Sequence, residues 1–187
     1  MTEQEINSVQ QDTQAWLEKA VIGLNLCPFA KSVHVNKRLR YVVSAAETPE
    51  ELLKELAREL LALQRADPNE IETTLLIHPR ALQDFLDFND FLGAAEALVE
   101  DLELDGELQI ASFHPQYQFG GTAPDDISNC TNRSPYPTLH ILRESSIAGA
   151  VEAMPDTDAI YENNMRTLET LGQAGWDALG LRKTWAA

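Results

Sequence analysis

Short runs of strand-forming residues alternate along this chain with longer stretches of helical periodicity, and this alternation limits the fold more than any other feature. The expected strands are residues 39–45, 73–77, 108–113 and 138–142, and the expected helices are 6–26, 52–63, 85–102, 145–154 and 157–171. Strands joined through helices favour right-handed crossovers and parallel pairing. We therefore predict an α/β fold with a four-stranded, largely parallel sheet flanked by helices. The direction of the fourth strand stays open, because a loop and not a helix leads into it.

The chain has the length of one domain. Its 187 residues contain no repeat and no linker-like segment, so we expect a single domain over 1–187 with a core of about 6–172 and a loosely structured tail over 173–187. Pro28 is expected to end or kink the first helix, because proline lacks the N–H that an α-helix needs. Thr48-Pro49-Glu50-Glu51 has the spacing of a capping box and predicts the start of the second helix.

The charge balance argues against several classes of partner. The chain has 14 basic and 30 acidic residues, a formal net charge of −16, and so it repels the phosphates of nucleic acid. An acidic surface also serves solubility alone. The polar N-terminal segment does not resemble a secretion signal, no apolar stretch could span a bilayer, and only two cysteines are present. We expect a soluble cytoplasmic protein with free thiols and no membrane partner; the sequence leaves its oligomeric state open.

Two of the predicted strands end in the same dipeptide, His-Pro, at residues 78–79 and 114–115. In an open parallel sheet, ligands bind at the carboxyl ends of the strands, which would make His78 and His114 neighbours at a ligand-binding edge. The structural alternative is that each imidazole only forms a hydrogen bond with a loop carbonyl.

A long aperiodic segment, residues 115–136, separates the last two strands, and connections of this length are usually functional or disordered. Its aromatic residues argue against disorder. Its polar residues, together with Arg143 after the last strand, suit a carboxylate or phosphate ligand, because guanidinium groups bind such oxyanions through paired hydrogen bonds. The alternative is that these groups pair with each other and hold the loop in place. The candidates are Asp125, Asp126, Asn129, Asn132 and Arg133.

Cys27 lies beside the predicted helix break, four residues before Lys31. A nearby lysine favours the thiolate, which is the nucleophilic form of cysteine. A cysteine among apolar residues at a helix end is also a common packing residue. The spacing excludes a C-x-x-C redox pair, and the chain has no P-loop, dinucleotide fingerprint or G-x-S-x-G motif.

Three uncommon blocks, residues 24–31 (LNLCPFAK), 113–119 (FHPQYQF) and 129–140 (NCTNRSPYPTLH), resemble the bacterial family of unknown function DUF1415 over about residues 12–172. The resemblance implies no reaction. It implies that the cysteine, the F-H-P-x-Y block and the T-N-R-S-P-Y-P block are part of the family pattern. Cys130 departs from that pattern, in which the position is usually aromatic. The matching residues are Cys27, His114, Tyr117, Asn132, Arg133 and Tyr136.

Three hypotheses follow. The first is a hydrolase or transferase for a small anionic substrate, with Cys27 as nucleophile, His114 as base and Asp126 orienting the histidine. In it, the substrate-binding residues are Lys31, Tyr117, Asn129, Asn132, Arg133, Tyr136 and Arg143. The second is a metal-dependent hydrolase or oxygenase using His78, His114 and Asp126, with His140 or Cys27 as further possible ligands. The third is a non-catalytic module that binds an anionic ligand. The cofactor is left open.

Overall fold

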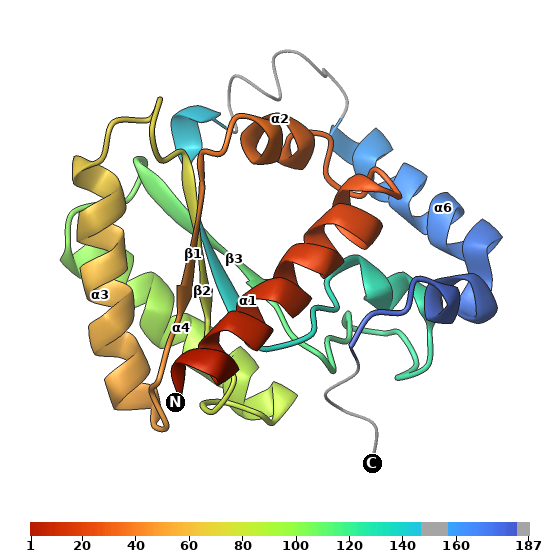
Figure 1. Cartoon of the computed structure of the whole chain (residues 1–187), viewed down its shortest axis with the longest axis horizontal. Helices are drawn as coiled ribbons and strands as arrows, with labels where there is room; N and C mark the ends of the chain where they lie inside the picture. The colour runs from red at the N-terminus through yellow and green to blue at the C-terminus, as the bar shows by residue number, and fades with distance from the viewer. Residues whose placement is uncertain (147–156, 183–187) are drawn as a thin grey trace.

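The computed structural model describes residues 1–146 and 157–182, and its centre is one four-stranded sheet (Figure 1). The strands stand in the order β1-β2-β4-β3. Their bounds are Leu39–Val43 for β1, Thr73–Ile77 for β2, Leu108–Phe113 for β3 and Thr138–Arg143 for β4. All four strands lie within a residue or two of the runs that the sequence predicted.

The sheet is mixed, so the prediction of a largely parallel sheet is wrong. Only β1 and β2 pair in parallel, while β4 pairs antiparallel with both β2 and β3. The reason is the long connection after β3, which reverses the chain and returns it as β4 into the position between β2 and β3. The three strands β1, β2 and β3 still point the same way, so their carboxyl ends share one edge of the sheet.

The helices α1 (Glu3–Trp16) and α3 (Pro49–Arg65) begin at threonine N-caps. Thr48 accepts a hydrogen bond from the Glu51 N–H, as the predicted capping box requires, but the Glu51 carboxylate accepts from the Glu47 N–H, one residue before the cap. A complete capping box occurs instead at the start of α1, between Thr2 and Glu5. That box carries the same T-x-x-E spacing and was not predicted.

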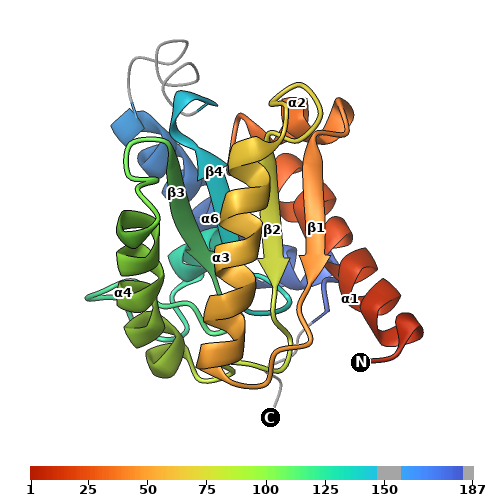
Figure 2. The same cartoon turned by 90° about the vertical axis from the view of Figure 1, so that its left-hand side faces the viewer.

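Two helices, α3 and α4 (Phe85–Asp101), cover one face of the sheet (Figure 2). Four leucines of α3 recur at helical spacing and are almost completely buried against Leu76, Leu139 and Ile141 of the sheet. Burying a leucine side chain contributes about 1.5–3 kcal/mol, so this stripe fixes α3 on its face. The four are Leu52, Leu56, Leu60 and Leu63.

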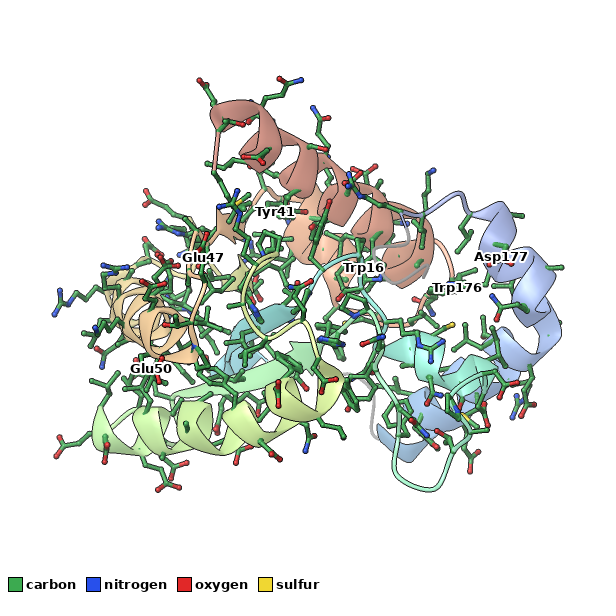
Figure 3. The ribbon with its side chains drawn as sticks, turned by 90° about the horizontal axis from the view of Figure 1, so that it is seen from below. Trp16, Tyr41, Glu47, Glu50, Trp176 and Asp177 are labelled. Atoms are coloured by element: carbon green, nitrogen blue, oxygen red, sulfur yellow. The ribbon has the colours of Figure 1, made fainter. Side chains whose placement is uncertain are left out.

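The opposite face is covered by α1, the π-helical turn η1 (Leu17–Ile22), the short α2 (Ala30–Val35) and α6 (Thr157–Ala178) (Figure 1). The predicted helix over 6–26 is therefore an α-helix followed by a π-helical turn. An apolar cluster joins η1 to Trp16, Leu168 and Trp176 (Figure 3).

The C-terminal segment is more ordered than the sequence suggested. The helix α6 continues to Ala178 across a kink at Gly172, whose φ of 64° is in the region that glycine adopts without strain. Trp176 is 4 % exposed, and Arg182 forms an ion pair with Asp12. Residues 173–178 of the predicted tail are therefore helical, and residues 183–187 lie outside the described part. Residues 147–154 of the helix expected over 145–154 also lie outside the described part.

None of the helices in the described ranges is both long enough and apolar enough to cross a membrane.

Candidate functional site

His114 is completely buried where β3 ends, and both of its ring nitrogens have partners. Its Nδ1 accepts a hydrogen bond from the Gln116 N–H at 3.0 Å, so the proton is on Nε2, which lies 3.2 Å from the Leu82 carbonyl. Burial lowers the pKa of His114 to about 4, and this imidazole is therefore neutral at pH 7. With both nitrogens engaged inside the protein, the ring has the arrangement of a structural histidine.

His78 lies at the same edge of the sheet and shares an aromatic neighbour with His114. The Phe88 ring is stacked on His114 at a centroid distance of 5.1 Å and lies 5.6 Å from His78. The His78 Nδ1 lies 3.0 Å from the Ala81 carbonyl, while its Nε2 is buried without a hydrogen-bond partner. Burial lowers the pKa of His78 to about 4. Both histidines are thus part of the packing between the sheet edge and α4.

The polar side chains of the long loop bind the loop itself. Asp126 is the N-cap of the 3-10 turn η2 (Ile127–Thr131). Its carboxylate accepts a hydrogen bond from the Ser128 N–H, and this bond lowers the pKa of Asp126. Asn129 is completely buried, accepting from the Phe119 N–H and the Thr122 hydroxyl and donating to Ala123. These polar side chains are therefore engaged within the loop.

Asn132 and Arg133 complete the same network. The Asn132 amide donates to the Ser112 carbonyl of β3. Arg133 donates to the carbonyls of Tyr117 at 3.2 Å and Pro124 at 2.5 Å. The loop is therefore held mainly by side chains donating to backbone carbonyls, and not by the carboxylate–guanidinium pairs considered as the alternative.

Arg143, Tyr117 and Tyr136 also interact with other parts of the protein. Arg143 lines the same cavity as Cys27, is 6 % exposed and donates to the carbonyls of Leu63 and Ala66 at the end of α3 and of Ile71 before β2. The Tyr117 ring lies 5.2 Å from Phe85. The Tyr136 hydroxyl donates to Asp12 at 2.7 Å. Burial is the main cause that raises the pKa of Tyr136, and the Asp12 carboxylate raises it further.

Cys27 lies in the wall of a cavity of about 130 Å³ between η1, α2 and the sheet. Apolar side chains form most of the wall, among them Trp16, Leu17, Val21, Phe29, Leu75 and Phe113. The thiol is partly accessible, in contrast to Cys130, which is 1 % exposed. Lys31 is exposed and is not among the residues that line this cavity.

His140 and Thr73 are part of the polar lining of the cavity, which also includes Glu72, Arg143 and Ser146. They lie on β4 and β2, and the His140 Nε2 is 2.7 Å from the Thr73 hydroxyl oxygen. Burial lowers the pKa of His140 to about 4, so the ring is neutral at pH 7. The alternation of β4 accounts for its direction: Leu139 and Ile141 are buried against α3 and α4, which turns His140 toward the other face.

The structure does not bring the predicted catalytic residues together. Cys27 lies near Thr73 at the start of β2, whereas His78 and His114 lie beyond the carboxyl ends of the strands. The five residue-to-residue steps from Thr73 to His78 span roughly 17 Å of extended chain. His114 also contacts α4, on the face opposite to α2. Cys27 and His114 are therefore separated along the strands and across the sheet.

The predicted metal ligands are not assembled either. Among the residues that the structure describes, no group of three or more histidine, cysteine, aspartate or glutamate side chains is placed to hold a metal ion. Sequence reasoning considered His140 only as a metal ligand and did not place it beside Cys27. The signal for its position was the alternation of buried residues in Thr138–Arg143, but using it required the partner helices on each face.

These features define a class: a three-layer α/β protein with a mixed sheet, in which a small apolar cavity lies between the sheet and an irregular helical segment. The chain belongs to the family described as "Protein of unknown function (DUF1415)", whose model matches residues 8–178. This confirms the family assignment made from the three sequence blocks. No curated protein and no solved structure matched the chain.

Proposed function

We propose that this protein binds a small, mainly apolar molecule in the cavity between η1, α2 and the sheet. The observation that carries the proposal is the composition of the cavity wall. Most of its residues are apolar, and the others are Cys27, Glu72, Thr73, His140, Arg143 and Ser146. Ligand sites typically combine such an apolar wall with a few placed polar groups. An apolar cavity of about 150 Å³ holds a benzene molecule, so about 130 Å³ suits a single ring or a short chain.

The local backbone supports the same location. The wall residues Leu17 and Val21 belong to the π-helical turn that ends the first helical segment, so an irregular piece of backbone forms this side of the cavity. After this turn, Asn25 adopts a positive φ of 55°, which is uncommon for a residue other than glycine. Two of the blocks that carry the family resemblance, 24–31 and 129–140, supply Cys27 and His140 to this cavity.

An anionic ligand is less well supported than the sequence suggested. Arg133 and Arg143 donate to backbone carbonyls. Arg143 also lines the cavity, but its Nη2 already donates to the carbonyls of Leu63, Ala66 and Ile71. A carboxylate in the cavity would therefore lose its water without gaining the paired hydrogen bonds of a free guanidinium, which is costly.

A second candidate is a hydrolase or acyl transferase in which His140 replaces His114 as the partner of Cys27. The observation that favours it is that both side chains line one cavity. The Cys27 sulfur would attack an acyl carbon while its proton moves to His140, which then protonates the leaving group. A buried imidazole with a pKa near 4 is a weak base, so binding is the better supported function.

The test uses two valine-to-tryptophan variants of α2. Val33 lines the cavity, and Val33→Trp is expected to fill it, whereas Val35 is 66 % exposed and Val35→Trp serves as the matched control. Toluene binding is measured by ligand-observed NMR. We expect binding to the unmodified protein and to Val35→Trp, and its loss in Val33→Trp. Equal binding by both variants, or none by the unmodified protein, would contradict the proposal.

The catalytic candidate is tested separately with p-nitrophenyl acetate, whose hydrolysis releases a coloured product. Cys27→Ala and His140→Phe are each expected to reduce the rate to that of the uncatalysed reaction if the two residues act together. Hydrolysis that is unchanged in Cys27→Ala would exclude this cysteine as the nucleophile and leave the binding proposal intact.

A further inference from the structure

The tautomer of His140 follows from its hydrogen bonds. The Thr73 hydroxyl lies 2.7 Å from the His140 Nε2 and 2.6 Å from the Ile141 carbonyl oxygen. A hydroxyl has one proton, and a carbonyl oxygen can only accept, so the Thr73 proton is donated to Ile141. The imidazole must then donate its own proton from Nε2 to the Thr73 oxygen. The Nδ1 of His140 is therefore left with a lone pair.

That lone pair has no hydrogen-bond partner in the described part of the chain. His140 is half-buried, and it lines the cavity beside the Phe113 ring at a centroid distance of 6.1 Å. A ligand in the cavity that supplies a donor can therefore form a hydrogen bond with this acceptor. The imidazole is neutral at pH 7, so an uncharged donor is sufficient.

We infer that the cavity recognises a small neutral molecule with a hydroxyl group on an apolar ring or short chain, whose O–H donates to the His140 Nδ1. This inference rests on the proposed binding function and adds the chemical class of the ligand. A phenol or a five- to six-carbon alcohol has this chemistry and is close to the size that the cavity admits.

Charged analogues fit less well. A carboxylate has only acceptors, so it would face the Nδ1 lone pair with no proton to share, and the Arg143 guanidinium in the wall already donates to backbone carbonyls. An ammonium group could donate, but it would have to give up its water inside a mainly apolar wall whose Glu72 carboxylate is already paired with Arg38, which costs far more than a hydroxyl does. The cavity should therefore discriminate by hydrogen-bond donor and by charge together.

The experiment compares phenol, toluene and benzoate by ligand-observed NMR titration of the full chain at pH 7. One additional hydrogen bond corresponds to about tenfold in affinity, so phenol is expected to bind about tenfold more tightly than toluene, with benzoate weakest. His140→Phe should reduce phenol binding to the level of toluene and leave toluene unchanged. His34 is partly exposed and does not line the cavity, so His34→Phe is the control and should retain the preference.

The outcomes separate the two proposals. In one outcome, toluene binding is lost in Val33→Trp and phenol binds no more tightly than toluene. This outcome would overturn the hydroxyl assignment and leave the cavity as the binding site. No binding of either compound would overturn both. Anisole, which retains the ring and oxygen of phenol but lacks the donor, gives a comparison that needs no variant: anisole binding as tightly as phenol would also overturn the assignment.

Discussion

Mild acid is expected to destabilise this protein through histidines that are buried in the neutral form. His78 is completely buried, and desolvation lowers its pKa from 6.5 to about 4. Between these two values the unfolded chain binds a proton that the folded chain does not bind. The free energy of unfolding must therefore fall as the pH decreases from about 6.5 toward 4.

The size of the effect follows from the same two pKa values. Proton linkage for one such histidine amounts to about 2 kcal/mol between pH 7 and pH 5. His114, whose pKa is lowered mainly by desolvation and raised to a smaller degree by its carbonyl partner and Asp84, acts in the same direction. Most carboxyl groups are still ionised at pH 5, so this range separates the histidine contribution from general acid unfolding.

The variant that tests this explanation is His78→Asn. The asparagine amide can replace the His78 Nδ1 as donor to the Ala81 carbonyl, and it removes both the titration and the unpaired Nε2. Urea unfolding is followed by tryptophan fluorescence at pH 7, 6 and 5. We expect His78→Asn to lose about 2 kcal/mol less than the unmodified protein over this range.

The control is His34→Asn, since the His34 side chain is 27 % exposed and pairs only with Glu18. Its pH dependence should match that of the unmodified protein. If His78→Asn also has the same pH dependence as the unmodified protein, the neutral burial of His78 does not contribute to acid sensitivity and the reasoning is refuted, whatever the absolute stability of the variant at pH 7.

Three further predictions concern single residues. Iodoacetamide should modify Cys27 and leave the buried Cys130 unmodified in the folded protein, as measured by mass spectrometry of the peptides. Equal modification of the two cysteines, or faster modification of Cys130, would contradict this prediction. Arg143→Met should reduce the free energy of unfolding by about 2–4 kcal/mol in urea titrations, because carbonyls at the end of α3 lose their donor; a loss below about 0.5 kcal/mol would mean that these bonds are not stabilising. Asn129→Ala should speed limited proteolysis within residues 115–136, since its amide holds both sides of that loop, and unchanged cleavage would contradict this role.

Local elements were predictable because their signals are local. The strand Thr73–Ile77 was located to the residue, since a short apolar run is bounded by polar residues and a His-Pro pair. The N-terminal cap of α3 followed from Thr48 and the proline after it. The position of β4 between β2 and β3 was not predictable, because it depends on pairings between residues distant in sequence and on a loop without periodicity.

The candidate site shows the same division. Cys27 was recognised as a notable thiol, but the histidine that shares its cavity is His140 and not His114. The repeated His-Pro pairs indicated correctly that His78 and His114 belong to one edge of the sheet, yet the aromatic contact with Phe88 could not be inferred from spacing. The polar loop looked like a ligand site because internal carbonyl bonding and ligand binding require the same residue types.

The π-helical turn also bears on how this chain tolerates insertions and deletions. A π-helical turn accommodates more residues per turn than an α-helix does, and Leu17–Ile22 connects directly to the segment that carries Cys27. Removing one residue here would favour ordinary α-helical bonding, which needs about one residue fewer per turn, so the segment up to Pro28 would keep its orientation. A deletion within the α-helical part of α1 would instead rotate the helix on its two sides by about 100° relative to each other. In related sequences, a single-residue gap in Leu17–Ile22 would therefore be compatible with the same cavity, whereas a gap earlier in α1 would indicate an altered one.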